Sequence, residues 1–115
     1  MSRKYVFQTK NDVFMFTSSG TGAMCAALEN LVNEGDKVLC LSLGNFGNRW
    51  AKIAESRGAI VEKIEVSAGE VISPEVLKKR LDEDTNKEIK IVTLTHSETS
   101  TGAANDIKTL CAIIR

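Results

Sequence analysis

Short apolar runs alternate with stretches of helical periodicity along this chain, and this alternation constrains its fold more than any other feature. Runs of strand type occupy residues 12–17, 37–42, 59–66 and 88–95. After the first run, apolar residues recur at helical spacing: Met24, Ala27, Leu28 and Leu31. Strand–helix alternation predicts crossover connections, and therefore an α/β fold with a mostly parallel sheet and helices on both faces.

Residues that favour helix ends stand between these segments. Gly35 and Gly58 follow two predicted helices, where glycine readily adopts the left-handed conformation that closes a helix. Ser73 and Pro74 are typical of the N-cap and the first position of the next helix. Asn105 is the predicted N-cap of the final helix.

The composition is that of an ordinary soluble globular domain with one modest core. The 115 residues are 43% hydrophobic and 26% charged, and the formal net charge is zero. Balanced charge with scattered lysines and arginines gives no sign of a nucleic-acid or anionic-membrane partner. We therefore expect one domain over residues 1–115, without an internal boundary.

The cysteines indicate a reducing compartment. Cys25, Cys40 and Cys111 are odd in number, widely spaced and set within apolar segments, with no spacing typical of a metal site. No apolar run is long enough to span a bilayer, and no signal peptide opens the sequence. We expect reduced thiols, no bound metal and a cytoplasmic location.

The turn over residues 18–22 (Ser-Ser-Gly-Thr-Gly) predicts an anion site. It lies between an apolar run and a helix, so the first N–H groups of that helix and the positive end of its dipole meet there. The glycines allow close approach, and the hydroxyls add donors. An ordinary helix cap would explain the same residues, and the kind of phosphate stays open.

Two further loops of similar composition leave predicted strands at the same end. They span residues 43–47 and 96–102, and with the turn over 18–22 they are rich in glycine and hydroxyl residues. Because ligands of parallel α/β folds bind at the carboxyl ends of the strands, the three loops predict one shared site.

The C-terminal residues suggest a piece of a larger domain. Residues 111–115 stop within an apolar helical repeat that carries no stop signal. About four predicted strands with apolar faces would also leave at least one bare sheet edge.

Five segments in this order closely resemble class V pyridoxal-phosphate-dependent aminotransferases, with the alanine–glyoxylate and serine–pyruvate branch nearest. They are residues 7–14, 18–24, 35–39, 44–50 and 95–102. The resemblance implies a homodimeric fold-type I enzyme that uses pyridoxal 5'-phosphate with amino acid and 2-oxo acid substrates. It also implies that residues 1–115 are the N-terminal half of the large, cofactor-binding domain.

By this resemblance, Ser19, Gly20 and Thr21 hold the phosphate of the cofactor. Phe46 resembles the aromatic residue that stacks on the pyridine ring, and Thr99 the hydroxyl residue that faces the phenolic oxygen. Each has a structural alternative. The first three can be a helix cap, Phe46 a core aromatic and Thr99 a residue that caps a loop.

The resemblance places the reaction centre outside this sequence. In the family, the lysine that forms the Schiff base and the aspartate on the pyridine nitrogen both follow the segment matched here. Lysines of this chain border strands or fall on polar helix faces, and we assign no catalytic role to His96 or Glu98. We therefore expect no catalytic residue in this chain and no transaminase activity from it alone.

Three other functions remain open. A cysteine desulfurase-like lyase shares the fold, although such enzymes generally place a histidine where Phe46 stands. A non-catalytic module could use the glycine turn for another phosphate ligand. An interaction module could bind a companion chain through its open sheet edge and final helix.

Overall fold

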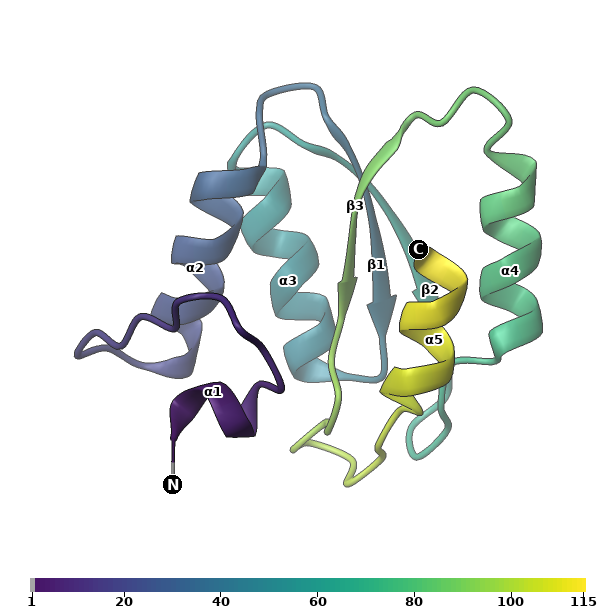
Figure 1. Cartoon of the computed structure of the whole chain (residues 1–115). Helices are drawn as coiled ribbons and strands as arrows, with labels where there is room; N and C mark the ends of the chain where they lie inside the picture. The colour runs from purple at the N-terminus through teal and green to yellow at the C-terminus, as the bar shows by residue number, and fades with distance from the viewer. Residues whose placement is uncertain (1) are drawn as a thin grey trace.

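The computed structural model describes residues 2–115, which form a parallel three-stranded sheet in the order β2-β1-β3 (Figure 1). The strands are β1 (Lys37–Ser42), β2 (Ile60–Glu65) and β3 (Ile89–Leu94). The helices are α1 (Arg3–Val6), α2 (Gly20–Leu31), α3 (Asn45–Ser56), α4 (Pro74–Glu83) and α5 (Ile107–Ile114). The predicted α/β class and parallel sheet are confirmed.

Two helical layers cover the sheet because the central strand is apolar on both faces. Leu39 and Leu41 of β1 pack in a cluster with residues of α4 and α5. Val38 and Cys40, which point the other way, pack with residues of α2 and α3. Figure 1 shows α2 and α3 on one side of the sheet and α4 and α5 on the other.

The predicted helix ends are largely confirmed. Gly35 and Gly58 have φ angles of 85° and 81°, in the left-handed region that favours glycine. The Ser73 hydroxyl accepts a hydrogen bond from the Val76 N–H, and Pro74 begins α4.

All three cysteines are free, and burial raises the pKa of the Cys40 thiol. Among the described helices, none is both long and apolar enough to cross a membrane.

The predicted strand over residues 12–17 is wrong. This segment is irregular in the structure, and the side chains of Phe14 and Met15 are 84% and 74% exposed. Apolar composition alone does not make a strand, because a strand needs a neighbour to pair its backbone groups. Within residues 2–115 no strand pairs with this segment, so the sheet has three strands rather than about four.

The predicted N-cap Asn105 is also wrong, by one residue. Asp106 caps α5, since its carboxylate accepts from the Thr109 N–H at 3.1 Å. Asn105 is buried and bridges two segments: its Oδ1 accepts from the Ile72 N–H at 3.0 Å, and its Nδ2 donates to the Thr95 carbonyl at 2.9 Å. It therefore ties the start of the loop after β3 to the segment before α4.

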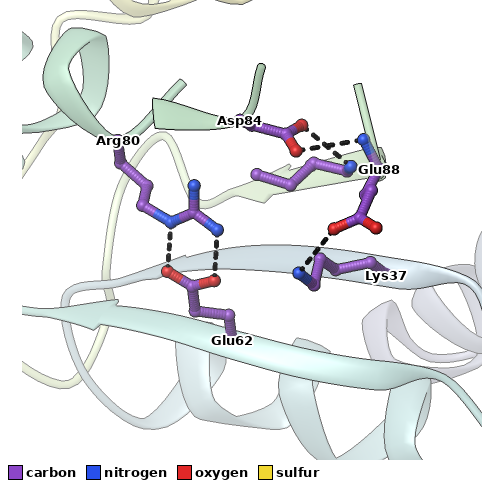
Figure 2. A network of polar contacts seen from close by, with 6 residues as sticks. Lys37, Glu62, Arg80, Asp84 and Glu88 are labelled. Atoms are coloured by element: carbon purple, nitrogen blue, oxygen red, sulfur yellow. Dashed lines mark hydrogen bonds and ion pairs between the residues drawn. The ribbon is translucent and has the colours of Figure 1, made fainter. Parts of the chain in front are cut away.

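A polar network joins the strands to α4, away from the loops that carry the predicted site (Figure 2). Arg80 of α4 donates two hydrogen bonds to the Glu62 carboxylate and thereby lowers the pKa of Glu62. Asp84 accepts from the backbone N–H of Glu88 and of the next residue, and Lys37 pairs with Glu88 at 3.4 Å. These contacts join α4 to β2 and the end of α4 to the start of β3, and they link β1 to the residue before β3.

Candidate functional site

The three loops predicted to share a site do lie at one end of the sheet. In Figure 1, the N-termini of α2 and α3 and the loop that follows β3 all lie at the lower end, toward which the strand arrows point. Backbone N–H groups of two helices therefore face the same region, each with the positive end of a helix dipole.

The N-terminus of α2 is open to solvent. Ser19 is its N-cap, and the Ser19 Oγ accepts from the Gly22 N–H at 3.1 Å. The N–H groups of Gly20 and Thr21 have no partner within the helix, by helix geometry. A Cβ added to Gly20 would meet no atom within 4 Å, and an open depression lined by residues 14–20 and Ala23 adjoins the turn. An anion has room to approach these donors.

The N-terminus of α3 is already filled by the carboxylate of Glu98. Glu98 is fully buried, and its Oε1 accepts from the N–H groups of Phe46 at 2.8 Å and Gly47 at 3.1 Å. Its Oε2 accepts from the Ser100 N–H at 3.3 Å. Ser100 in turn accepts from the Asn45 N–H through its hydroxyl, at 3.2 Å. The loop after β3 is therefore fixed to the first turn of α3.

The environment of Glu98 favours its charged form. Burial raises the pKa of this carboxyl, but the hydrogen bonds from Gly47, Ser100 and Phe46 lower it by more, so that the pKa lies below its usual range. A buried, ionised carboxylate with three backbone donors serves as an internal helix cap.

Arg49 brings two of the predicted residues together. Its Nη1 donates to the Thr21 Oγ1 at 2.7 Å, and its Cζ lies 4.6 Å from the centroid of the Phe46 ring. The phosphate candidate on α2 and the ring-stacking candidate on α3 thus contact the same guanidinium group. Sequence reasoning missed Arg49, although it follows Phe46 at helical i+3 spacing and so lies on the same helix face.

Thr99 is positioned through its neighbours in the chain. It is exposed in the turn between Glu98 and Ser100, both of which hydrogen-bond to α3. The turn is tight: the Gly102 N–H donates to the Glu98 carbonyl at 2.7 Å, and the Glu98 N–H to the Ala103 carbonyl at 2.8 Å. The structure therefore holds Thr99 on the same fixed loop that caps α3.

The donors and surfaces at this end of the sheet fit an aromatic phosphate ester. One helix N-terminus is neutralised by Glu98, whereas the other is open, lined by hydroxyls and next to the positive charge of Arg49. Phe46 is half-buried, and the same guanidinium lies over one face of its ring. Within residues 2–115, no three His, Cys, Asp or Glu side chains cluster to hold a metal ion.

Comparison with known proteins identifies the family. The family model "Aminotransferase class-V" matches residues 3–115. The soluble hydrogenase 42 kDa subunit of Anabaena cylindrica is 45% identical over 90% of this chain and 27% of its own length. Serine–glyoxylate aminotransferase of Hyphomicrobium methylovorum is 41% identical over 90% of this chain and 26% of its length.

A solved structure gives the same result. The crystal structure of alanine–glyoxylate aminotransferase from Nostoc sp. superposes with a TM-score of 0.82 and 39% identity, covering 95% of this chain and 29% of that one. The chain thus spans between a quarter and a third of the length of these relatives. With this fold and a family match over nearly its whole length, the chain belongs to the class-V aminotransferase family.

Proposed function

We propose that this chain supplies the phosphate-binding turn and the ring-stacking wall of a pyridoxal 5'-phosphate site. The observation that carries the proposal is the contact of Arg49 with both Thr21 and Phe46, beside the open N-terminus of α2. That arrangement offers anion donors and an aromatic face side by side. Pyridoxal 5'-phosphate carries both a phosphate and an aromatic ring. The proposal is also supported by the names of relatives, such as serine–glyoxylate aminotransferase.

In this proposal each residue has a separate task. The N–H groups of Gly20 and Thr21 and the Thr21 hydroxyl donate to phosphate oxygens, while Ser19 holds the first turn of α2 in place. Phe46 presents its ring to the pyridine, and the Thr99 hydroxyl faces the phenolic oxygen. Bound at such a site, the cofactor supplies the aldehyde that takes up an amino group and the ring that withdraws electrons.

We further propose that the complete enzyme is a homodimer that transfers an amino group from alanine or serine to glyoxylate or another 2-oxo acid. Its attachment lysine would lie outside this chain, which alone would bind the cofactor reversibly and without transaminase activity. Three of the described lysines, Lys37, Lys63 and Lys78, are engaged in ion pairs with Glu88, Glu65 and Asp82.

A reduction experiment tests this part of the proposal. The chain is incubated with pyridoxal 5'-phosphate, treated with borohydride and mapped by peptide mass spectrometry, with thermal shifts measured for the cofactor and for nucleotides. We expect a larger thermal shift with pyridoxal 5'-phosphate than with nucleotides, and only scattered, substoichiometric lysine labelling. A stoichiometric adduct on one lysine would contradict the absence of the attachment residue. A stronger response to nucleotides would favour a different phosphate ligand.

A further inference from the structure

Arg49 contacts both Thr21 and Phe46, and these contacts give the arginine a role of its own at the site. It lies on α3, one helical turn after Phe46, and is partly buried. Its guanidinium donates to the Thr21 Oγ1 of α2 at 2.7 Å while it covers the ring of Phe46. Because a guanidinium has donors only, the direction of the bond to Thr21 is fixed: the threonine oxygen accepts.

The direction of this bond determines which hydrogen bonds the Thr21 hydroxyl can still make. A hydroxyl has one proton to donate, and the bond from Arg49 uses a lone pair of the oxygen rather than that proton. Thr21 lies in the first turn of α2, so no preceding helical turn offers its hydroxyl a carbonyl acceptor. The charged donor also polarises the O–H group, which strengthens the hydrogen bond that the group donates.

The charge of Arg49 is not cancelled by an ion pair among the described residues. The second arginine of the α3 region, Arg57, pairs with Glu29 at 3.1 Å, but no ion pair of residues 2–115 includes Arg49. The nearby carboxylate of Glu98 is occupied by the N–H groups of Phe46 and Gly47. A positive charge therefore lies beside the open N-terminus of α2.

We propose that Arg49 is a positioning residue of the phosphate site and acts through Thr21. It orients and polarises the Thr21 hydroxyl as a donor to one oxygen of a phosphate monoester, rather than contacting the phosphate itself. The stacking on Phe46 holds the guanidinium in the place from which it reaches Thr21. This inference rests on the proposed function, because the monoester is the phosphate of pyridoxal 5'-phosphate.

A double-mutant cycle on the full chain tests the inference. Affinities for pyridoxal 5'-phosphate and for pyridoxal, which lacks the phosphate, are measured for wild type, Arg49→Gln, Thr21→Val and the double variant. One charge-assisted hydrogen bond corresponds to roughly tenfold in affinity. We expect each single variant to lose about that factor for the phosphate ester only, and the double variant to lose no more than Thr21→Val.

Two variants serve as controls. Arg57→Gln removes an arginine near the end of the same helix and should leave both affinities unchanged. Arg49→Lys keeps a charged donor and should recover part of the lost affinity. A urea unfolding curve of each variant confirms that it is folded.

Three outcomes would overturn the inference. Losses that multiply in the double variant would mean that Arg49 contacts the phosphate directly. Equal losses for pyridoxal and its phosphate ester would mean that Arg49 only supports the structure. A wild-type chain that binds both compounds equally, or neither, would instead remove the proposed function, and this inference with it.

Discussion

Replacing Glu98 with alanine is expected to lower the free energy of unfolding by about 3 kcal/mol, since each buried donor left without an acceptor costs about 1–3 kcal/mol. Three backbone donors lose their acceptor: the N–H groups of Phe46, Gly47 and Ser100. Glu98 is fully buried, so water replaces the carboxylate poorly. Equilibrium unfolding in urea, followed through the fluorescence of Trp50, measures the loss.

A glutamate in an exposed ion pair provides the control. Glu29 pairs with Arg57 and its side chain is 60% exposed, so Glu29→Gln is expected to change stability by less than about 1 kcal/mol. If Glu98→Ala were no more destabilising than Glu29→Gln, the internal cap of α3 would not hold the two loops together.

The same carboxylate makes stability depend on pH. The folded-state pKa of Glu98 lies below its unfolded value, so its contribution is present above the unfolded pKa of about 4.3 and is lost as pH falls through the folded value. Stability of the wild type should therefore decline more steeply below that pH than stability of Glu98→Gln. Parallel profiles would contradict an ionised Glu98.

Replacing Gly47 with alanine is expected to cost about 2–3 kcal/mol, at the upper end of the usual effect of overpacking. A Cβ at Gly47 would lie 2.6 Å from the Cα of Ser42, the last residue of β1, and backbone cannot rotate out of the way. The helix would have to move off the strand, which would also displace Phe46 from Glu98.

Gly20 supplies the matched control, because a Cβ there meets no atom within 4 Å. Gly20→Ala should leave the urea midpoint unchanged or raise it slightly, since alanine favours the helix over glycine and nothing obstructs its Cβ. Equal midpoints for Gly47→Ala and Gly20→Ala would show that α3 does not pack against Ser42 of β1 closely enough to exclude a Cβ.

The sequence is sufficient for those parts of the fold whose signals are local. The strand over residues 37–42 is confirmed at its predicted bounds, because it is apolar on both faces and flanked by glycine turns. The segment over 12–17 has a similar composition but lacks a paired neighbour, which no local pattern reveals. Asn105 and Asp106 are both good caps, and only the contacts of Asn105 with distant backbone groups separate them.

In the candidate site, too, some residues are recognisable from local sequence and others only from tertiary contacts. The position of Ser19, Gly20 and Thr21 at the start of a helix could be predicted, because a turn before a helix has a recognisable composition; their role toward a phosphate stays a prediction. The roles of Arg49 and Glu98 could not be predicted. Arg49 contacts a residue 28 positions away in the sequence, and Glu98 contacts residues 51 and 52 positions away. Tertiary packing, rather than periodicity, brings a guanidinium to Thr21 and a carboxylate to α3.

The central claim is that the loops at the carboxyl end of the sheet bind pyridoxal 5'-phosphate, and amide chemical-shift mapping by NMR tests it most directly. On titration with the cofactor, we expect the largest shifts at Ser19, Gly20, Thr21, Phe46 and Thr99. The residues of the network in Figure 2, Glu62 and Arg80 among them, should remain unchanged. Shifts confined to that network, or absent from the three loops, would contradict the account.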